Sequence, residues 1–223
     1  MCGRYALFSP ADVRERYGVV DGEATVTYNA APSQSLPVVA SADPEAFTSM
    51  EWGLVPPWAD DDSDAFVNAR GETLREKRSF RDAYERRRCV VPADGFYEWH
   101  DGTPYYFERA DGRPFVMAGV WEPHTPETTQ TGLGEFASAG DGPNRTAETR
   151  RTFAVVTAEA TGAVADYHHR ASVILDPDEA TRWLTADDPA DLLDPSLPDL
   201  SVRRVSTAVD DPTVDRPDLV DPV

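Results

Sequence analysis

Cysteine is the second residue of the chain, in the opening segment Met1-Cys2-Gly3-Arg4-Tyr5. If the initiator methionine is removed, Cys2 carries both an α-amine and a thiol. About 10% of an α-amine is neutral at pH 7, against roughly 0.04% of a lysine amine, because their pKa values are near ~8 and ~10.4. A neutral amine adds to an aldehyde and gives a Schiff base, and the adjacent thiol can then close on the imine carbon to form a thiazolidine. Cys2 is therefore a candidate nucleophile toward aldehydes, the alternative being a small residue that merely follows the start codon.

A carboxylate lies inside an aromatic segment that is predicted to be a strand, Gly95-Phe96-Tyr97-Glu98-Trp99. Side chains alternate along a strand, so Glu98 shares a face with Phe96, while Tyr97 and Trp99 lie on the other face. A carboxyl group beside apolar groups has a raised pKa, which suits proton transfer near neutral pH. Glu98 is a candidate acid or base, the alternative being an edge-strand glutamate that faces water.

A histidine pair precedes a second predicted strand, in His168-His169-Arg170 followed by Ala171-Ser172-Val173-Ile174-Leu175. A histidine at the end of a strand can act as an acid or a base at neutral pH. The alternative is an exposed loop histidine. The four histidines have no metal-ligand spacing with one another or with the two cysteines, so the sequence predicts no metal, and we expect no other cofactor.

Three segments place an arginine two residues after a polar residue: Cys2 with Arg4, Asn68 with Arg70, and His168 with Arg170. In an extended chain such residues point to one face, so each guanidinium would lie beside its polar partner. The pattern is only suggestive, because arginine is common in this chain.

Two tryptophans bracket a turn that is stiffened by proline, in Trp52-Gly53-Leu54-Val55-Pro56-Pro57-Trp58. Exposed aromatic side chains on such a turn can stack on unpaired bases, each contributing ~1–3 kcal/mol. The alternative is that both tryptophans belong to the core, which we favour for Trp52.

Charge is the strongest feature of the composition. The 223 residues include 40 acids and 21 bases, of which only Lys77 is a lysine, and the net charge is -19. An acidic, lysine-poor composition predicts adaptation to high salt, as in a halophile, the alternative being an ordinary acidic protein. The overall charge argues against nucleic-acid binding, but residues 70–88 hold eight bases and four acids, a local net charge of +4. This region is either a basic surface or a solvated helix face with acid–base pairs.

The length predicts one domain with a substantial core. No apolar run approaches the length of a membrane span and no signal peptide is recognised, so we expect a cytoplasmic, soluble protein. Two cysteines in such a protein argue against a disulfide framework, and Cys89, in an apolar run, is predicted to be buried.

The elements that would position these residues are mostly short strands separated by proline and glycine. We expect helices at 10–17, at 72–88 with a break near Ser79, and at 177–184. Strands are expected near 3–8, 36–41, 47–53, 89–92, 95–100, 105–108, 115–121, 153–158, 172–175 and 203–207. This order predicts an α+β domain, mainly antiparallel β with a barrel-like core, over residues 1–210. Residues 125–150 are predicted to be a flexible insertion between two strands, and residues 211–223 an extended tail.

The sequence resembles the SRAP family (SOS response-associated peptidase), the abasic-site processing proteins. The resemblance rests on segments spread in order from residue 1 to about 207: Met1-Cys2-Gly3-Arg4, Asn29-Ala30-Ala31-Pro32, Trp52-Gly53-Leu54-Val55-Pro56-Pro57-Trp58, Asn68-Ala69-Arg70-Gly71-Glu72, Arg88-Cys89-Val90-Val91-Pro92, Gly95-Phe96-Tyr97-Glu98-Trp99, His168 with Arg170, Val173-Ile174-Leu175 and Val205-Ser206-Thr207.

The resemblance implies a monomeric enzyme of the DNA damage response that binds single-stranded DNA and captures abasic sites as a covalent thiazolidine. It implies that Cys2 is the nucleophile, that Asn68 positions the reacting amine and sugar, that Glu98 shuttles protons, and that His168 assists opening of the abasic sugar. It also implies autocatalytic removal of Met1 and a possible lyase activity.

For DNA binding, the resemblance implies that three arginines hold the phosphates flanking the lesion, Arg4, Arg70 and Arg170. Thr157 and Trp58 are weaker carry-overs to DNA contacts. We expect Cys2 to lie near the other catalytic candidates in the folded chain.

The chain departs from the family pattern around the histidines. The family usually has Asp, Met and Pro where this chain has His169, Ala171 and Ser172. The spacing to Arg170 favours His168 as the catalytic histidine. Two other functions stay open at this stage: a cysteine peptidase that uses Cys2 and His168 on protein substrates, and a non-catalytic single-strand binder.

Overall fold

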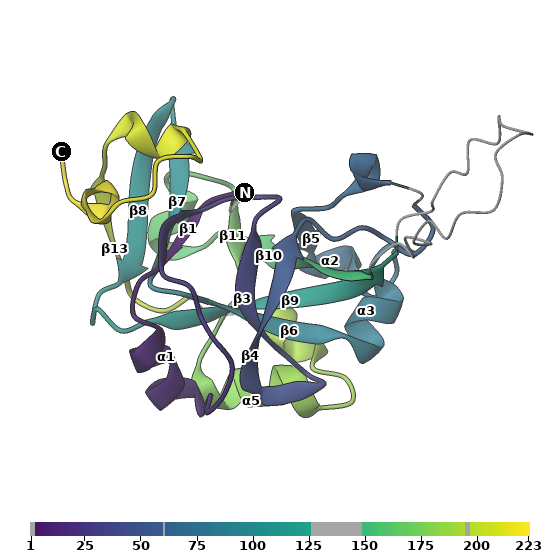
Figure 1. Cartoon of the computed structure of the whole chain (residues 1–223). Helices are drawn as coiled ribbons and strands as arrows, with labels where there is room; N and C mark the ends of the chain where they lie inside the picture. Colours follow the sequence, from purple (N-terminus) through teal and green to yellow (C-terminus); the bar gives the residue numbers. More distant parts are fainter. Residues whose placement is uncertain (1–2, 60, 126–148, 195–196) are drawn as a thin grey trace, which may run out of the picture.

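The computed structural model describes residues 3–59, 61–125, 149–194 and 197–223, and its strands form two sheets (Figure 1). The larger, eight-stranded sheet has the order β11-β10-β4-β3-β6-β9-β12, and β5 also pairs with β10. Because β10 pairs with β9 as well, the strands β10, β4, β3, β6 and β9 close on themselves into a barrel. Its strands are β3 (Ser35–Ala40), β4 (Asp43–Trp52), β5 (Asn68–Arg70), β6 (Arg88–Ala93), β9 (Phe115–His124), β10 (Arg150–Glu159), β11 (Arg170–Ser172) and β12 (Ile174–Leu175).

The smaller sheet carries the beginning of the chain and has five antiparallel strands. Their order across the sheet is β13 (Leu200–Arg204), β8 (Thr103–Arg109), β7 (Gly95–His100), β1 (Tyr5–Leu7) and β2 (Thr27–Ala30). In the larger sheet β10 is parallel to β4 and to β5, and its other pairings are antiparallel. The predicted α+β class with a mainly antiparallel, barrel-like core is confirmed.

The helices are short and lie on the outside of the sheets (Figure 1). They are α1 (Pro10–Tyr17), α2 (Gly71–Leu74), α3 (Arg81–Arg86), α4 (Gly162–Ala165) and α5 (Pro177–Thr185), with 3-10 turns η1 (Asp62–Asp64), η2 (Ala190–Leu193), η3 (Thr207–Asp210) and η4 (Pro217–Val220). The predicted helices 10–17 and 177–184 are confirmed as α1 and α5. At the start of α5, Glu179 accepts a hydrogen bond of 2.9 Å from the Asp176 amide, which is half of a capping box.

The predicted break near Ser79 is confirmed, because Ser79 lies between the separate helices α2 and α3. The predicted extent over 72–88 is wrong, since the break spans residues 75–80 and Arg88 belongs to strand β6. Its guanidinium is buried and donates to the backbone carbonyls of Tyr84, at 2.8 Å, and of Trp183 and Ala186. These bonds fix the end of α3 and the end of α5 to β6, which no pattern within residues 72–88 reveals. The short strands β2 and β5 were not predicted.

The main core fills the space between the two sheets and their covering helices. Cys89 is buried there as predicted, and burial raises the pKa of its thiol. A second, smaller cluster forms on the five-stranded sheet, where Val205, Val209 and Leu219 pack against Tyr97 and Tyr106. Residues 211–223, expected to be extended, contain the turn η4 and contribute to this cluster.

The predicted insertion is flanked by β9 and β10, which pair with His124 opposite Arg150. Residues 126–148 lie outside the described residues. In the described part of the chain, no helix combines the length and the apolar character that a membrane span requires.

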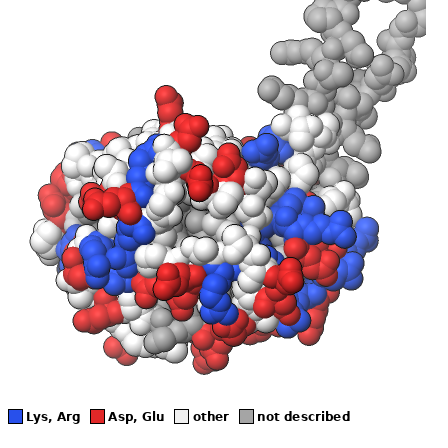
Figure 2. All heavy atoms as spheres, turned by 90° about the horizontal axis from the view of Figure 1, so that it is seen from below, with Lys and Arg blue, Asp and Glu red and all other residues white. Residues whose placement is uncertain are grey.

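Acidic and basic side chains are interspersed on the face that carries α1 and α5, which Figure 2 shows from below. Asp176 lies 3.4 Å from Arg16 and 3.3 Å from Arg109, and Arg182 lies 2.8 Å from Asp191. Exposed pairs of this kind contribute little to stability and are weakened by salt.

Candidate active site

The beginning of the chain lies alongside the strand that carries Glu98. β1 pairs with β7, and the Tyr97 amide donates to the Arg4 carbonyl oxygen at 3.0 Å. Continuing this antiparallel register places Gly3 opposite Glu98. Cys2 lies outside the described residues, so its proximity to the other catalytic candidates stays a prediction.

Glu98 is a buried carboxyl group, with only 3% of its surface exposed. β7 is an inner strand of its sheet, between β8 and β1, so the alternative of an edge-strand glutamate is wrong. Burial raises the pKa of Glu98, because low-polarity surroundings disfavour the charged form. The carboxyl group can therefore hold a proton closer to neutral pH than an exposed glutamate can.

The loop after α4 brings the histidine pair to the same sheet. The Tyr167 ring lies 4.7 Å from the Tyr105 ring on β8, and the Tyr167 carbonyl oxygen lies 3.3 Å from Nδ1 of His100 at the end of β7. Since Tyr167 directly precedes His168, these contacts anchor the histidine pair beside the strand of the buried carboxyl group.

His168 is held by the backbone of Arg170. The Arg170 amide donates to Nδ1 of His168 at 2.9 Å, and the Arg170 carbonyl oxygen lies 3.0 Å from the same nitrogen. The amide can donate to Nδ1 when the ring proton is on Nε2, and Nδ1 can donate to the carbonyl oxygen when that nitrogen carries the proton, so the backbone of Arg170 has a contact for each tautomer. Burial lowers the pKa of His168, so the neutral form prevails at pH 7. The His169 ring lies 4.4 Å from the His168 ring, centroid to centroid.

The candidates lie close enough together to affect one another's pKa values. A positive charge on His169 lowers the pKa of Glu98, which opposes the effect of burial. Positive charges on His168, Arg170 and Arg70 lower the pKa of His169. Residues from β5, β7 and the loop before β11 therefore converge, although they are far apart in the sequence.

Asn68 and Arg70 reach the site through an unusual parallel pairing. β5 runs parallel to β10, with Asn68 opposite Val155 and Arg70 opposite Thr157. On the other side of β10, Thr157 pairs with Ser172 of β11. Two of the three polar–arginine segments thus flank one strand, which supports the suggestion that they act together.

Arg170 is engaged inside the protein. Only 8% of its surface is exposed, and its guanidinium forms a two-pronged ion pair with Glu72, one contact being 2.9 Å. It also donates to the carbonyl oxygen and hydroxyl of the fully buried Thr157, at 2.5 and 3.2 Å. Arg70, in contrast, is exposed, and Arg4 is half-buried. Arg70 and Arg4 therefore present more surface to a ligand than Arg170 and Thr157 do.

The two tryptophans play different parts. Trp52 is fully buried, stacks on Phe153 with 6.2 Å between ring centroids, and donates to the Val67 carbonyl oxygen at 2.9 Å. The prediction that it belongs to the core is confirmed, and its bond to Val67 fixes the chain just before Asn68. Trp58 is 39% exposed, as stacking on a base requires.

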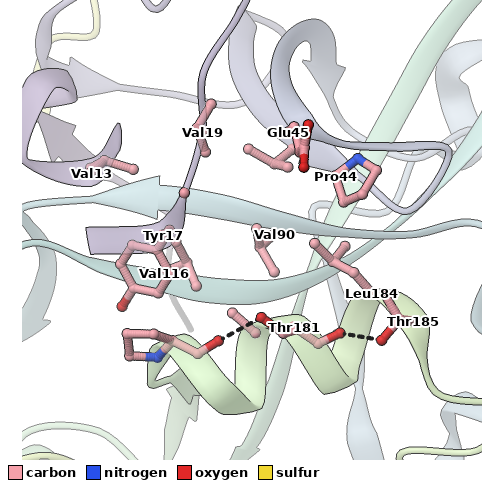
Figure 3. Close-up of a pocket in the computed structure, with 14 residues that line it drawn as sticks. Val13, Tyr17, Val19, Pro44, Glu45, Val90, Val116, Thr181, Leu184 and Thr185 are labelled. Atoms are coloured by element: carbon pink, nitrogen blue, oxygen red, sulfur yellow. Dashed lines mark hydrogen bonds between the residues drawn. The ribbon is translucent and has the colours of Figure 1, made fainter. Parts of the chain in front are cut away.

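A cavity of about 280 Å³ lies between α1 and α5 and the larger sheet (Figure 3). Valines form much of its wall, and the Thr181 and Thr185 hydroxyls donate along α5, to the carbonyl oxygens of Pro177 and Thr181 at 3.0 and 2.8 Å. The candidate residues described above do not line this cavity. Over the described ranges, no three His, Cys, Asp or Glu side chains are grouped so that they could hold a metal ion.

Two supporting residues were missed by sequence reasoning, Glu72 and Tyr167. Glu72 stands in the segment Asn68-Ala69-Arg70-Gly71-Glu72 that carries the resemblance, so the signal was present but was not assigned a role. Nothing in the local pattern marked Tyr167, because its partners lie on a distant hairpin.

Comparison with known proteins finds similar sequences over nearly the whole chain. The model of the family described as SOS response associated peptidase (SRAP) matches residues 1–212. "Abasic site processing protein YoqW" of Bacillus subtilis is 32% identical over 241 residues, with 99% of each chain covered. "Abasic site processing protein YedK" of Escherichia coli is 29% identical and covers 82% of this chain and 79% of its own.

A crystal structure of a protein from Bacteroides thetaiotaomicron has the same fold. Its TM-score is 0.76 at 24% identity, with 100% of both chains covered. The match over residues 1–212, together with the full-length relative, shows that the chain belongs to the SRAP family.

Proposed function

We propose that this protein processes abasic sites by forming a covalent thiazolidine crosslink between Cys2 and the abasic-site aldehyde in single-stranded DNA. The main support is the buried Glu98 carboxyl group, with its raised pKa, opposite Gly3 in the continued strand register. An amine that condenses with an aldehyde needs a nearby group that gives and takes protons near neutral pH. The names of the relatives support the choice of an abasic site as the substrate.

The reaction begins once Met1 is removed, a step that we assign to the protein itself. His168 transfers a proton from the C1′ hydroxyl group to the ring oxygen of the closed sugar and so promotes opening to the aldehyde. The Cys2 amine adds to C1′ and passes one proton to the carbonyl oxygen. Glu98 then protonates the resulting hydroxyl group, water leaves, and the remaining N–H proton returns to Glu98 to give the imine. The Cys2 thiol then adds to the imine carbon, and the thiol proton passes to the nitrogen. Asn68 orients the amine and the sugar.

The DNA strand is held by Arg4, Arg70 and Trp58, which present surface to it. Arg170 and Thr157 support the DNA site from within the protein, since Arg170 is paired with Glu72 and Thr157 is buried. A single strand is the substrate because a duplex would hide the sugar.

High salt should affect binding and crosslinking differently. Phosphate-driven affinity falls steeply with salt, and the screening length is only about 3 Å at 1 M. A protein adapted to high salt would depend on stacking and on the covalent bond. We expect crosslink yield to vary less with salt than reversible binding does, and equal slopes would contradict this.

The test is incubation of the protein with a single-stranded oligonucleotide whose uracil has been excised, followed by mass spectrometry of the adduct. We expect a thiazolidine at Cys2 in the protein lacking Met1. Cys2→Ala and an extra residue before Cys2 should both abolish the adduct, the second because it converts the amine into an amide. Cys2→Ser should give no stable ring but would retain a hydroxyl nucleophile for a peptidase. An adduct that survives Cys2→Ala would refute the proposal.

A further inference from the structure

The segment after β13 is strapped to β2 by one buried side chain. Asn29 is 1% exposed, and its amide nitrogen lies within hydrogen-bonding distance of three carbonyl oxygens: those of Val209 at 3.3 Å, Asp211 at 2.9 Å and Val214 at 2.8 Å. Because this amide group has two N–H donors, at least one of them is shared. A side chain that serves three carbonyls of one segment fixes the path of that segment.

A second bond and a hydrophobic contact hold the same segment. The Tyr28 amide donates to the Asp215 carboxylate at 2.6 Å. Val209 and Leu219 are fully buried against the ring of Tyr97, which lies on β7 beside Glu98. The segment is therefore part of the sheet's packing rather than a loose end.

The strapped segment touches the beginning of the chain at Asp210. The Asp210 carbonyl oxygen accepts from Nη2 of Arg4 at 3.3 Å, and the Asp210 carboxylate accepts from Nε1 of Trp99 at 2.7 Å. Arg4 thus meets the carbonyl oxygen of Asp210 directly, while the carboxylate of the same residue accepts from Trp99. Burial of the guanidinium lowers the pKa of Arg4, and the charges of the Asp210 and Asp211 carboxylates oppose that shift. The hydrogen bond to the carbonyl oxygen orients the guanidinium.

We propose that Asn29 is a positioning residue of the DNA site: it holds residues 209–214 so that the Asp210 carbonyl oxygen aims Arg4 at a phosphate of the bound strand. The proposal rests on the single-strand binding proposed above, but it needs neither the crosslink nor removal of Met1. Asn29 acts only through Arg4, so its loss should reproduce the loss of Arg4.

The salt dependence of reversible binding gives the measurement. Each phosphate contact on a single strand contributes about 0.7 to the slope of log K against log salt. We would measure fluorescence anisotropy with an intact, lesion-free oligonucleotide across a salt series. Arg4→Ala should make the negative slope shallower by about 0.7, and Asn29→Ala should make it shallower by a similar amount. The double variant should be no shallower than either single variant.

The matched control is Arg88→Met. Arg88 is also buried and also donates to three backbone carbonyls, but it joins α3 and α5 to β6. A slope that falls equally in this control would show a general effect of destabilisation and would overturn the proposal. If Asn29→Ala does not fold, Asp215→Ala removes the exposed strap at Tyr28 and should lower the slope in the same direction.

The salt-slope results for Asn29 can be told apart from the results of the crosslinking experiment. A wild-type slope in Asn29→Ala and Asp215→Ala, or additive effects of Asn29→Ala and Arg4→Ala, would overturn the positioning role even if the thiazolidine forms. Failure of the wild-type protein to crosslink an abasic oligonucleotide would refute the proposed reaction, yet the slopes would still decide the role of Asn29.

Discussion

Asp94, at the junction of β6 and β7, offers a quantitative test of how the beginning of the chain is held. It is 7% exposed, and one carboxylate oxygen accepts from the amides of Phe8 at 2.6 Å and Ser9 at 2.9 Å. The other oxygen accepts from the Ser9 hydroxyl, so the side chain of Ser9, the N-cap residue of α1, makes no capping hydrogen bond to the helix. The Asp94 amide donates in turn to the Ala6 carbonyl oxygen at 2.8 Å.

Asp94→Ala removes all three acceptor contacts and leaves two partly buried amides without a protein acceptor. Each such amide costs about 1–3 kcal/mol. Water reaches part of this site, and removal of a buried carboxylate recovers some free energy, so we expect a net loss of about 2–3 kcal/mol in the free energy of unfolding at pH 7. For a chain of this size that lowers Tm by about 4–12 °C.

Asp94→Asn is the control. Its amide oxygen can accept from the two backbone amides and its NH₂ group can donate to the Ser9 hydroxyl, so we expect a change below about 1 kcal/mol. Urea unfolding followed by tryptophan fluorescence measures both variants. An Asp94→Ala protein as stable as wild type, or an Asp94→Asn protein as unstable as Asp94→Ala, would refute the reasoning.

The pH dependence gives a second check on Asp94. Burial raises its pKa in the folded protein in spite of the hydrogen bonds that it accepts. The folded state therefore binds the proton more tightly, and the wild-type free energy of unfolding loses this contribution as pH rises from about 4 through the folded-state pKa. Asp94→Asn lacks this term, so its stability relative to wild type should increase over that range. A relative decrease would mean that the folded-state pKa is lowered instead.

Three further variants test the site. Glu98→Gln should slow crosslinking about 10²–10⁴-fold, and unchanged kinetics would exclude a proton-transfer role for Glu98. Because burial raises the Glu98 pKa, the variant should also gain stability relative to wild type as pH rises through that pKa. Gly95→Ala would place a Cβ against the Tyr106 ring and 2.5 Å from the Phe107 carbonyl oxygen. It should lower the free energy of unfolding in urea by about 3 kcal/mol. A loss below about 1 kcal/mol would contradict this close approach. Trp58→Ala should weaken single-strand binding by about 1–3 kcal/mol and leave Tm unchanged, since the ring is 39% exposed; a wild-type Kd from anisotropy would remove Trp58 from the DNA site.

The sequence alone determined the features that are local in the chain. Side-chain period, proline and capping residues located α1, α5 and most of the strands, because these signals act over one or two turns or one strand. The raised pKa of Glu98 was also readable, since the carboxyl group lies within an aromatic strand, and Glu98 is indeed buried. The same local chemistry made Cys2 a candidate nucleophile toward aldehydes, which stays a prediction.

Only the tertiary structure decided which segments meet. β10 pairs in parallel with β4 and β5 and also closes the ring with β9, and strand patterns carry no signal for such partners. Arg170 looks like a surface cation in the sequence, but on β11, beside β10, it pairs with Glu72 and is buried. Pairing over long sequence distances depends on packing and loop closure, whereas a residue pattern records only the face that each segment turns toward the core. The sequence therefore set the chemistry of each candidate residue, and the fold set which of the described candidates lie close together.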